Sequence, residues 1–300
     1  MKLKRLTLLM AVLALVLAAC GGGTTDTTAA PSETTTAMTE TTAMTETTTA
    51  MTETTTAMTE TTEAMADIST IDPGTLTICT DSPYPPMEFE QDGEFTGFDI
   101  ELMRKIAGDL GLDLAVNNTG FDPITSGTAM ASGQCDMAAA SITITDERKQ
   151  AVDFSDPYFT ADQSLLTKKD SGITTLSDLS GKNLGVQTGT TGEMYAQENA
   201  PSDATITSFE NPGDLFVALE SGEIVAILQD LVVNGPRTLE DDTVTVVETY
   251  PTNEEYGFAY EKGANPDLQA AVNDLLAKFK DDGTYDALYQ KWFGSSSTTG

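Results

Sequence analysis

The sequence predicts an α/β fold in which mostly parallel sheets are flanked by helices. Three observations support this prediction. Short apolar and β-branched runs alternate with longer segments whose apolar residues recur at helical spacing. Loops that contain glycine or proline separate the two kinds of segment. The length of 300 residues also fits two domains of ordinary size. Alternation of strands with helices is typical of parallel sheets.

The beginning of the chain predicts export. A short basic region precedes an apolar run, 6–19, which is too short to span a bilayer as a helix. Cys20 follows directly and is succeeded by three glycines, a pattern that resembles a bacterial lipobox. We therefore expect residues 1–19 to be a lipoprotein signal peptide. Cys20 would carry the lipid and anchor the protein on the outer face of the bacterial cell membrane. The alternative is an ordinary signal peptide cleaved after Ala19.

Residues 20–66 are predicted to form a stalk that begins with the lipidated cysteine. The unit Ala-Met-Thr-Glu-Thr-Thr recurs in it, and acids are its only charged residues. Such a composition cannot offset the entropy lost on ordering, so we expect the stalk to be disordered. A disordered tail is expected at 295–300.

The first half of the folded body predicts one helix among three strands. The helix, Asp99–Leu110, has leucine and isoleucine residues along one face. The proline-rich run that follows the first strand cannot be helical. The strands are expected at Thr75–Cys79, Leu112–Val116 and Cys135–Ala140.

The second half of the body continues the alternation. The last helix carries a clear apolar stripe at helical spacing. Strands are expected at Asn183–Gln187, Ile224–Leu228 and Thr243–Val247. Helices are expected at Glu193–Asn199, Gly213–Ser221 and Asp267–Asp282.

Cys79 and Cys135 raise the question of a disulfide, because an exported protein allows one. Cys79 is expected near the end of one strand and Cys135 at the start of another. If those strands are parallel neighbours, the two cysteines lie about 13 Å apart, which is too far to bridge. We therefore expect two buried free thiols.

Composition excludes several classes of function. The formal net charge is −32, so nucleic acid and anionic lipid headgroups are poor partners. The chain has no histidine, which excludes Ser-His and Cys-His catalytic pairs. The cysteines are poorly arranged for zinc. We expect no catalytic residue, no metal and no cofactor.

The run from Ser141 to Lys149 is the most informative motif. Two hydroxyls alternate with isoleucines after a strand, and Thr145 then begins a helix whose first turn is acidic. Arg148 lies on that first turn. A hydroxyl at a strand end and an arginine nearby suit a carboxylate ligand, which a guanidinium binds with two hydrogen bonds.

The body resembles the family 3 solute-binding proteins, which bind polar amino acids for bacterial ABC transporters. The resemblance covers nearly all of residues 75–294. It rests on matching segments in the right order, which are 81–87, 97–110, 121–122, 142–148, 152–158, 185–191, 228–230, 282–285 and 291–294.

This resemblance implies a two-lobed periplasmic-binding-protein-like fold of type II. Lobe 1 would comprise 67–165 plus 257–294, and lobe 2 would comprise 166–256. Two crossover strands near 164–168 and 256–260 would act as hinges. The lobes would close on a free polar amino acid and deliver it to a membrane permease, and we expect a monomer.

The resemblance also implies roles for ten residues. Arg148 would hold the ligand α-carboxylate, helped by Thr143 and the Ser141 backbone, and Asp230 would hold the α-ammonium. The glycine turn before the helix at 193–199 offers free N–H groups to an anion. The remaining roles go to the following side chains: Tyr84 and Phe121 around the ligand side chain, Asp81 and Gln187 at its polar end, and Thr190 and Thr191 at the helix start.

The ligand is expected to be a neutral polar or cationic amino acid, with glutamine ahead of arginine. An aspartate at position 81 accompanies glutamine or basic amino acids in related proteins. Some binders of basic amino acids carry a serine where this chain has Ala140. The first strand-loop has no arginine, which disfavours an acidic ligand.

Two other functions remain open. Cyclohexadienyl dehydratases share the fold, and such chemistry needs a general acid, for which Glu193 is the candidate near the glycine turn. An acid in a first helical turn is also an ordinary helix start. A module that senses its ligand for a receptor is the other alternative.

Overall fold

The computed structural model describes residues 68–294. The predicted signal peptide, the lipidated Cys20, the stalk and the tail lie outside this range. None of the helices within 68–294 is both long and apolar enough to cross a membrane.

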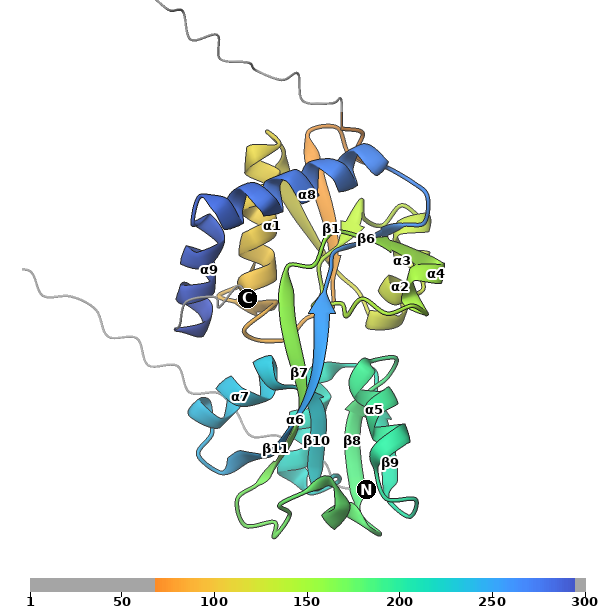
Figure 1. Ribbon diagram of the computed structural model, residues 1–300, viewed down its shortest axis with the longest axis vertical. Helices are drawn as coiled ribbons and strands as arrows, with labels where there is room; N and C mark the ends of the chain where they lie inside the picture. Colours follow the sequence, from red (N-terminus) through yellow and green to blue (C-terminus); the bar gives the residue numbers. More distant parts are fainter. Residues whose placement is uncertain (1–67, 295–300) are drawn as a thin grey trace, which may run out of the picture. The chain divides into compact units, whose positions relative to one another are not determined.

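The first of two five-stranded sheets (Figure 1) has the order β4-β1-β5-β12-β6. β1 is parallel to β4 and β5, whereas β12 is antiparallel to β5 and β6. Leu76 and Ile78 pack with residues of the three helices α1, α8 and α9 in one core. Cys79, which points to the opposite face, belongs to a second core with residues of α2 and α3. The bounds of these strands are Thr75–Thr80 for β1, Asp113–Asn118 for β4, Met137–Ala138 for β5, Val152–Phe154 for β6 and Ala259–Glu261 for β12.

The second sheet has the order β11-β7-β10-β8-β9. β10, β8 and β9 are parallel to one another, and β7 is antiparallel to β10 and β11. Leu228 faces a core that includes Ala196 of α5, whereas Ile227 faces a core that includes Leu215 of α6. The bounds are Phe159–Lys168 for β7, Asn183–Gln187 for β8, Thr205–Phe209 for β9, Ala226–Asp230 for β10 and Val244–Tyr256 for β11.

Helices cover both sheets, and a small hairpin completes the fold. The helices are α1 (Phe98–Asp109), α2 (Phe121–Thr125), α3 (Thr128–Ala131), α4 (Arg148–Ala151), α5 (Thr191–Asn199), α6 (Pro212–Ser221), α7 (Leu231–Glu240), α8 (Pro266–Asp281) and α9 (Thr284–Phe293). A 3-10 turn, η1, spans Leu176–Leu179, and the hairpin pairs β2 (Phe89–Gln91) with β3 (Glu94–Thr96).

The strands β7 and β11 run side by side from one sheet to the other (Figure 1). Phe159–Ala161 pair with β11, whereas the later residues of β7 also pair with β10 in the second sheet. β11 then continues through Gly257 into β12 of the first sheet. The prediction of an α/β fold with two sheets of mostly parallel strands flanked by helices is therefore confirmed.

Most predicted elements agree with the structure within a few residues. The predicted strand at Cys135–Ala140 is much shorter, because only Met137 and Ala138 pair with β1 and β12. The predicted strand at Thr243–Val247 is much longer, because β11 reaches Tyr256. A long edge strand with two register shifts lacks the simple alternation that sequence patterns detect.

The prediction that Cys79 and Cys135 are free thiols is wrong, because they form a disulfide. Their Cα atoms lie 5.5 Å apart. The estimate assumed that Cys135 lies in an extended strand, but β5 begins only at Met137. Cys135 instead lies in the loop between α3 and β5, and the N–H of the next residue, Asp136, donates to the carbonyl of Thr77 in β1.

Candidate functional site

One pocket of about 430 Å³ contains all ten residues that the sequence predicted as a site. Gln187 and Asp230 are the last residues of β8 and β10, and the other eight come from loops and helix starts that follow β1, β4, β5 and β8. The carboxyl ends of strands in open α/β sheets are where ligands bind, because loops and helix N-termini converge there. Four further residues line the pocket, and these are Glu88, Ala140, Gly192 and Gln229.

Arg148 is the only cation that lines this pocket, and its side chain is buried. Its Nη1 donates to the carbonyl of Thr143 at 2.8 Å, and its Nη2 donates to the carbonyl of Gly189 at 3.0 Å. The guanidinium lies 5.0 Å from the ring centre of Phe121. Burial lowers the pKa of Arg148 to about 10, so the side chain stays charged at neutral pH. This burial excludes a solvated surface arginine.

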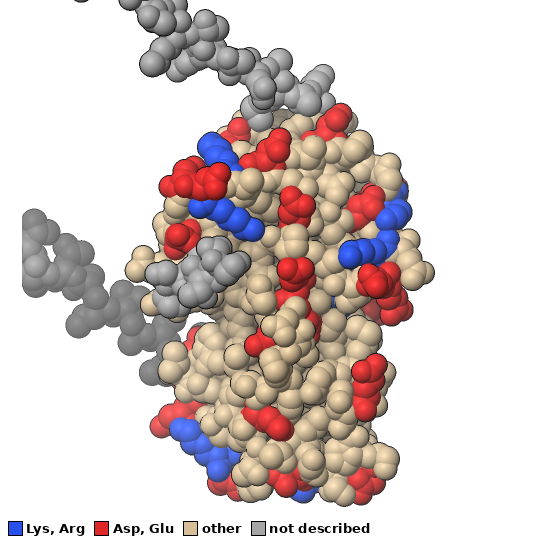
Figure 2. Space-filling view, viewed as in Figure 1, with Lys and Arg blue, Asp and Glu red and all other residues tan. Residues whose placement is uncertain are grey.

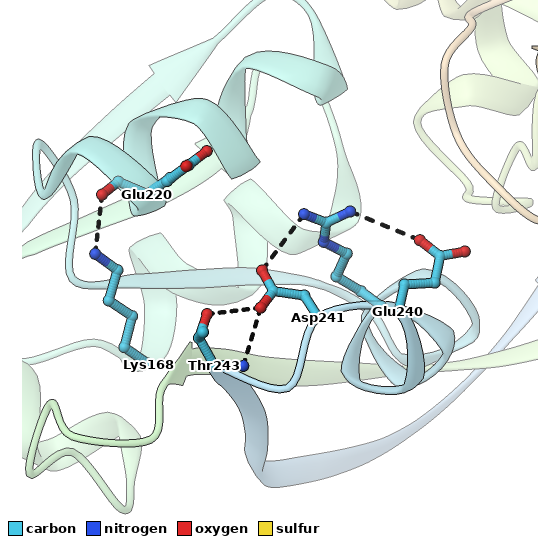
Figure 3. Close-up of polar contacts among 6 residues, drawn as sticks. Lys168, Glu220, Glu240, Asp241 and Thr243 are labelled. Carbon is cyan, nitrogen blue, oxygen red and sulfur yellow. Dashed lines mark hydrogen bonds and ion pairs between the residues drawn. The ribbon is translucent and has the colours of Figure 1, made fainter.

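A second arginine, Arg237 on α7, has the opposite surroundings. It forms ion pairs with Glu240 at 3.6 Å and with Asp241 at 3.5 Å, the two acids labelled in Figure 3. Its side chain is partly exposed. Such exposed pairs contribute little to stability. Arg237 therefore offers a matched control for Arg148.

Asp230 ends β10 on the other side of the pocket and is buried. Its carboxylate accepts hydrogen bonds from the hydroxyls of Tyr84, at 2.8 Å, and Tyr256, and from Nε2 of Gln163. Burial, helped by the charge of Glu254, raises the pKa of Asp230 to about 6. The carboxylate is thus anionic above that pH and faces the same pocket as Arg148.

Asp81 lies after β1 and accepts a hydrogen bond of 2.6 Å from Nε2 of Gln187, which ends β8. Burial raises the pKa of Asp81 to about 6, and the bond from Gln187 opposes this shift. The pair joins an element of each sheet at one end of the pocket.

The two threonines at the start of α5 have different partners. Thr190 caps the helix, because its hydroxyl oxygen accepts from the N–H of Glu193 and its proton goes to the carbonyl of Gln187. Thr191 donates to Glu254 at 2.6 Å. The N–H groups of Thr191 and Gly192 belong to the first turn, where a helix supplies no partner of its own.

Glu193, the predicted candidate for a general acid, supports this turn. Its carboxylate accepts from the N–H of Gly189 at 2.7 Å and from the hydroxyl of Ser208 at 2.6 Å. It does not line the pocket that contains the ten predicted residues. The geometry therefore gives Glu193 a structural role, in which it holds the glycine turn in place.

Two buried acids that the sequence analysis missed lie behind Ser141. Its hydroxyl donates to Glu88 at 3.1 Å and its N–H donates to Asp99 at 3.0 Å. Ser141 has a positive φ of 50°, a conformation that costs free energy for a residue other than glycine. Tyr158 also donates to Asp99. Burial raises the pKa of both acids, and the charge of Asp99 raises that of Glu88 further.

Three more missed residues come from the strands that connect the sheets. Gln163 lies on β7, and Glu254 and Tyr256 lie on β11. Glu254 accepts hydrogen bonds from Thr143, Thr191 and Gln163. The pattern Glu254-Glu255-Tyr256 gives no local sign of such contacts, because all three partners are remote in the sequence.

Acidic side chains outnumber basic ones in the lining of the pocket. Three carboxylates, of Asp81, Glu88 and Asp230, line it together with the one guanidinium of Arg148. The surface is also acidic, since Asp and Glu side chains are spread over the face shown in Figure 2. Residues 67–300 carry 40 acids and 12 bases. A cationic group is therefore favoured in the pocket and attracted toward it.

Lowering the pH from 8 to 5 should stabilise the ligand-free protein. The buried acids Asp81, Glu88, Asp99 and Asp230 have pKa values above those of the unfolded chain, near 4. The folded state therefore binds more protons than the unfolded state across this range. Stability then falls as pH rises, by up to about 1.4 kcal/mol per pH unit for each proton. Thermal unfolding at a series of pH values measures the slope.

The variant Asp99→Asn should flatten that slope, because it removes one of the buried acids. The exposed Asp113 gives the matched control, and Asp113→Asn should leave the slope unchanged. A free energy of unfolding that increases steadily from pH 5 to pH 8 would contradict the assignment.

Comparison with known proteins identifies relatives over the described body. The sequence profile of the bacterial extracellular solute-binding proteins, family 3, matches residues 76–295. The L-cystine-binding protein TcyJ of Escherichia coli (strain K12) is 35% identical over 229 residues, which are 75% of this chain and 85% of TcyJ.

Solved structures share the fold. An ancestral arginine-binding protein bound to glutamine is 38% identical, with a TM-score of 0.70, over 75% of this chain and 100% of that chain. An ancestral amino-acid-binding protein that is a precursor of cyclohexadienyl dehydratase is 41% identical, with a TM-score of 0.68. That similarity covers 73% of this chain and 96% of the ancestral protein.

The family profile spans almost all of the described residues, and a relative above 30% identity covers three quarters of the chain. The resemblance noted from the sequence motifs is thus confirmed. The chain belongs to the bacterial extracellular solute-binding proteins, family 3.

Proposed function

We propose that this protein is an extracytoplasmic receptor that binds a free polar amino acid and delivers it to the permease of an ABC transporter. The observation that supports this most is the position of Arg148 and Asp230. They carry opposite charges, are buried and line one pocket. Arg148 begins α4, between β5 and β6 of the first sheet, whereas Asp230 ends β10 of the second sheet. An α-carboxylate and an α-ammonium are the complementary groups of a free amino acid.

The carboxylate end would lie at Arg148. A guanidinium can make two parallel hydrogen bonds to a carboxylate. The N–H groups of Thr191 and Gly192, at the start of α5, add donors and the positive end of a helix. Phe121, below the guanidinium, holds the plane of Arg148 in place.

The side chain of the ligand would extend toward Asp81. At neutral pH Asp81 is anionic, because its pKa is about 6. Its charge is still available to the ligand side chain after Arg148 and Asp230 have paired with the α-carboxylate and the α-ammonium. A buried, unpaired anion is costly, so a cationic side chain is favoured there. We therefore propose a basic amino acid, with glutamine second. This order reverses the expectation from the sequence, which did not count the charges of the pocket.

A screen of the purified protein by thermal shift against the twenty amino acids tests the proposal. A ligand that binds only the folded state raises the melting temperature. Arginine or lysine should give the largest rise. Asp81→Asn should weaken arginine binding at least tenfold and glutamine binding less than threefold, because only the former loses an ion pair.

The control for this screen is Glu210→Gln. Glu210 is exposed and its charge acts on Asp81, but its side chain does not line the pocket. This variant should bind arginine as the wild type does. If none of the twenty amino acids shifts the wild type, the binding proposal fails.

An enzymatic function is the second candidate, supported by the precursor of cyclohexadienyl dehydratase among the relatives. The buried acids Asp81 and Glu88, whose pKa values are raised, are better placed for a general acid than Glu193 is. Formation of an aromatic product from prephenate or arogenate would establish this activity. A role in sensing, rather than uptake, would be indicated by a partner receptor in place of a permease.

The two sheets would belong to two lobes that close on the ligand. Lobe 1 would comprise 67–165 plus 257–294 and lobe 2 would comprise 166–256, closing about β7 and β11. The receptor would act as a monomer held at the membrane by a lipid on Cys20.

A further inference from the structure

Glu254 is a carboxylate on β11 that joins side chains from three separate parts of the chain. The hydroxyls of Thr143 and Thr191 both donate to its Oε2, at 2.7 and 2.6 Å. Nε2 of Gln163 donates to its Oε1 at 3.0 Å. Thr143 follows β5 of the first sheet, and Thr191 begins α5 of the second sheet. Both threonines line the pocket.

These contacts determine the direction in which each hydroxyl points its proton. A threonine hydroxyl has one proton and two acceptor lone pairs, and an ionised carboxylate can only accept. Thr143 and Thr191 therefore each spend their single proton on Glu254. Toward the pocket, both hydroxyl oxygens can then only accept hydrogen bonds. They therefore suit an N–H donor of the ligand and not a carboxylate.

Gln163 extends the same arrangement to Asp230. Its side chain is fully buried, and its Nε2 donates to Asp230 as well as to Glu254. The two protons of an amide nitrogen are thereby used. The same amide nitrogen lies 3.4 Å from the hydroxyl oxygen of Thr191, and this oxygen is the acceptor in that contact. Gln163 and Glu254 thus connect Asp230 with Thr143 and Thr191 through hydrogen bonds.

We propose that Glu254 is a positioning residue that fixes the hydroxyls of Thr143 and Thr191 as acceptors for the ligand ammonium. This inference rests on the proposed amino-acid binding and refines it. It assigns the hydroxyl of Thr143, which the sequence analysis expected to help bind the carboxylate, to the ammonium instead, together with the hydroxyl of Thr191. The carboxylate is then left to Arg148 and backbone N–H groups.

The substitution Glu254→Gln should reverse the direction in which the hydroxyls of Thr143 and Thr191 point their protons. Gln163 must still donate to residue 254, so the new amide oxygen is held toward Gln163 and the new amide nitrogen toward the threonines. That nitrogen is a donor, so Thr143 and Thr191 would accept from it and direct their protons into the pocket. A proton facing an ammonium is repulsive.

The experiment compares an amino acid with its analogue that lacks the α-ammonium. Isothermal titration uses L-arginine with 5-guanidinopentanoate, and L-glutamine with 4-carbamoylbutanoate. Glu254→Gln should weaken binding of the amino acid at least tenfold and binding of the analogue less than threefold. The matched control is Glu255→Gln, which removes the same charge from the exposed neighbouring position on β11 and should change neither.

A double-mutant cycle separates hydroxyl orientation from the simple loss of a charge. In a Thr143→Val, Thr191→Val background, Glu254→Gln should cost less than threefold, because no hydroxyls remain to be oriented. A tenfold loss that persists in this background would overturn the inference, since the charge of Glu254 would then act directly. Equal losses for the amino acid and its analogue, or wild-type affinity in Glu254→Gln, would also overturn it.

The outcome is distinguishable from failure of the proposed function. If the wild type binds no amino acid, amino-acid binding itself is refuted, and the role of Glu254 with it. If the wild type binds and only the Glu254 predictions fail, amino-acid binding stands. The melting temperature of ligand-free Glu254→Gln, measured alongside, should stay within a few degrees of the wild type.

Discussion

Arg148→Ala should lower the affinity for the amino-acid ligand at least about a hundredfold. The guanidinium is buried in the pocket against Phe121 and is the one cation that lines it. Its removal would leave a ligand carboxylate buried without a counter-charge, which costs about 3 kcal/mol or more. By affinity arithmetic, this corresponds to about a hundredfold or more in Kd. Isothermal titration with the amino acid found in the thermal screen measures the loss.

Two further variants make this result specific. Arg237→Ala removes an arginine that pairs with Glu240 and Asp241 on the surface, and it should bind as the wild type does (Figure 3). Arg148→Lys keeps the charge but not the two parallel donors, so an intermediate loss is expected. Wild-type affinity in Arg148→Ala, in a protein that still unfolds cooperatively, would refute the role of Arg148.

Removal of the disulfide between Cys79 and Cys135 should lower the free energy of unfolding by about 3–4 kcal/mol. The bond closes a loop with a sequence separation of 56 residues, and closing a loop of that size restricts the unfolded chain. For a body of this size, the melting temperature of a Cys79→Ala, Cys135→Ala variant should fall by about 10 °C. Thermal unfolding of the variant and the wild type measures the difference.

A thiol assay checks the bond itself. Cys79 and Cys135 are the only cysteines after Cys20. The denatured wild-type body should therefore show no free thiol without reductant and two after reduction. Reductant should not alter the melting temperature of the double variant. Two free thiols in the unreduced protein would restore the expectation drawn from the sequence and contradict the structure.

Local patterns were sufficient for much of the fold. The helices α1 and α8 were predictable because their apolar residues recur along one face, and those faces form the core of the first sheet. The ten predicted site residues line one pocket because they follow strands whose carboxyl ends converge. Asp230 is an example, since the apolar run before it predicts a strand and its polar side chain marks the end.

Local patterns could not predict the contacts between residues that are far apart in the sequence. Glu254 lies 111 residues from Thr143 and 91 residues from Gln163, and no spacing rule connects them. Glu88 and Ser141 are likewise joined across 53 residues. The disulfide was missed for a related reason. The distance estimate depended on where one short strand begins, and element boundaries are weakly determined by local propensity.

The sequence by itself determined the α/β class, the order of most strands and helices, the family and ten of the residues that line one pocket. These follow from hydrophobic periodicity, from the chemistry of strand ends and from motifs in a characteristic order. Only the tertiary structure decided the bond between Cys79 and Cys135, the buried acids Glu88 and Asp99, and the direction of the hydroxyls that face Glu254. Each of these depends on the distance and burial of groups far apart along the chain, which the packing of the whole body sets.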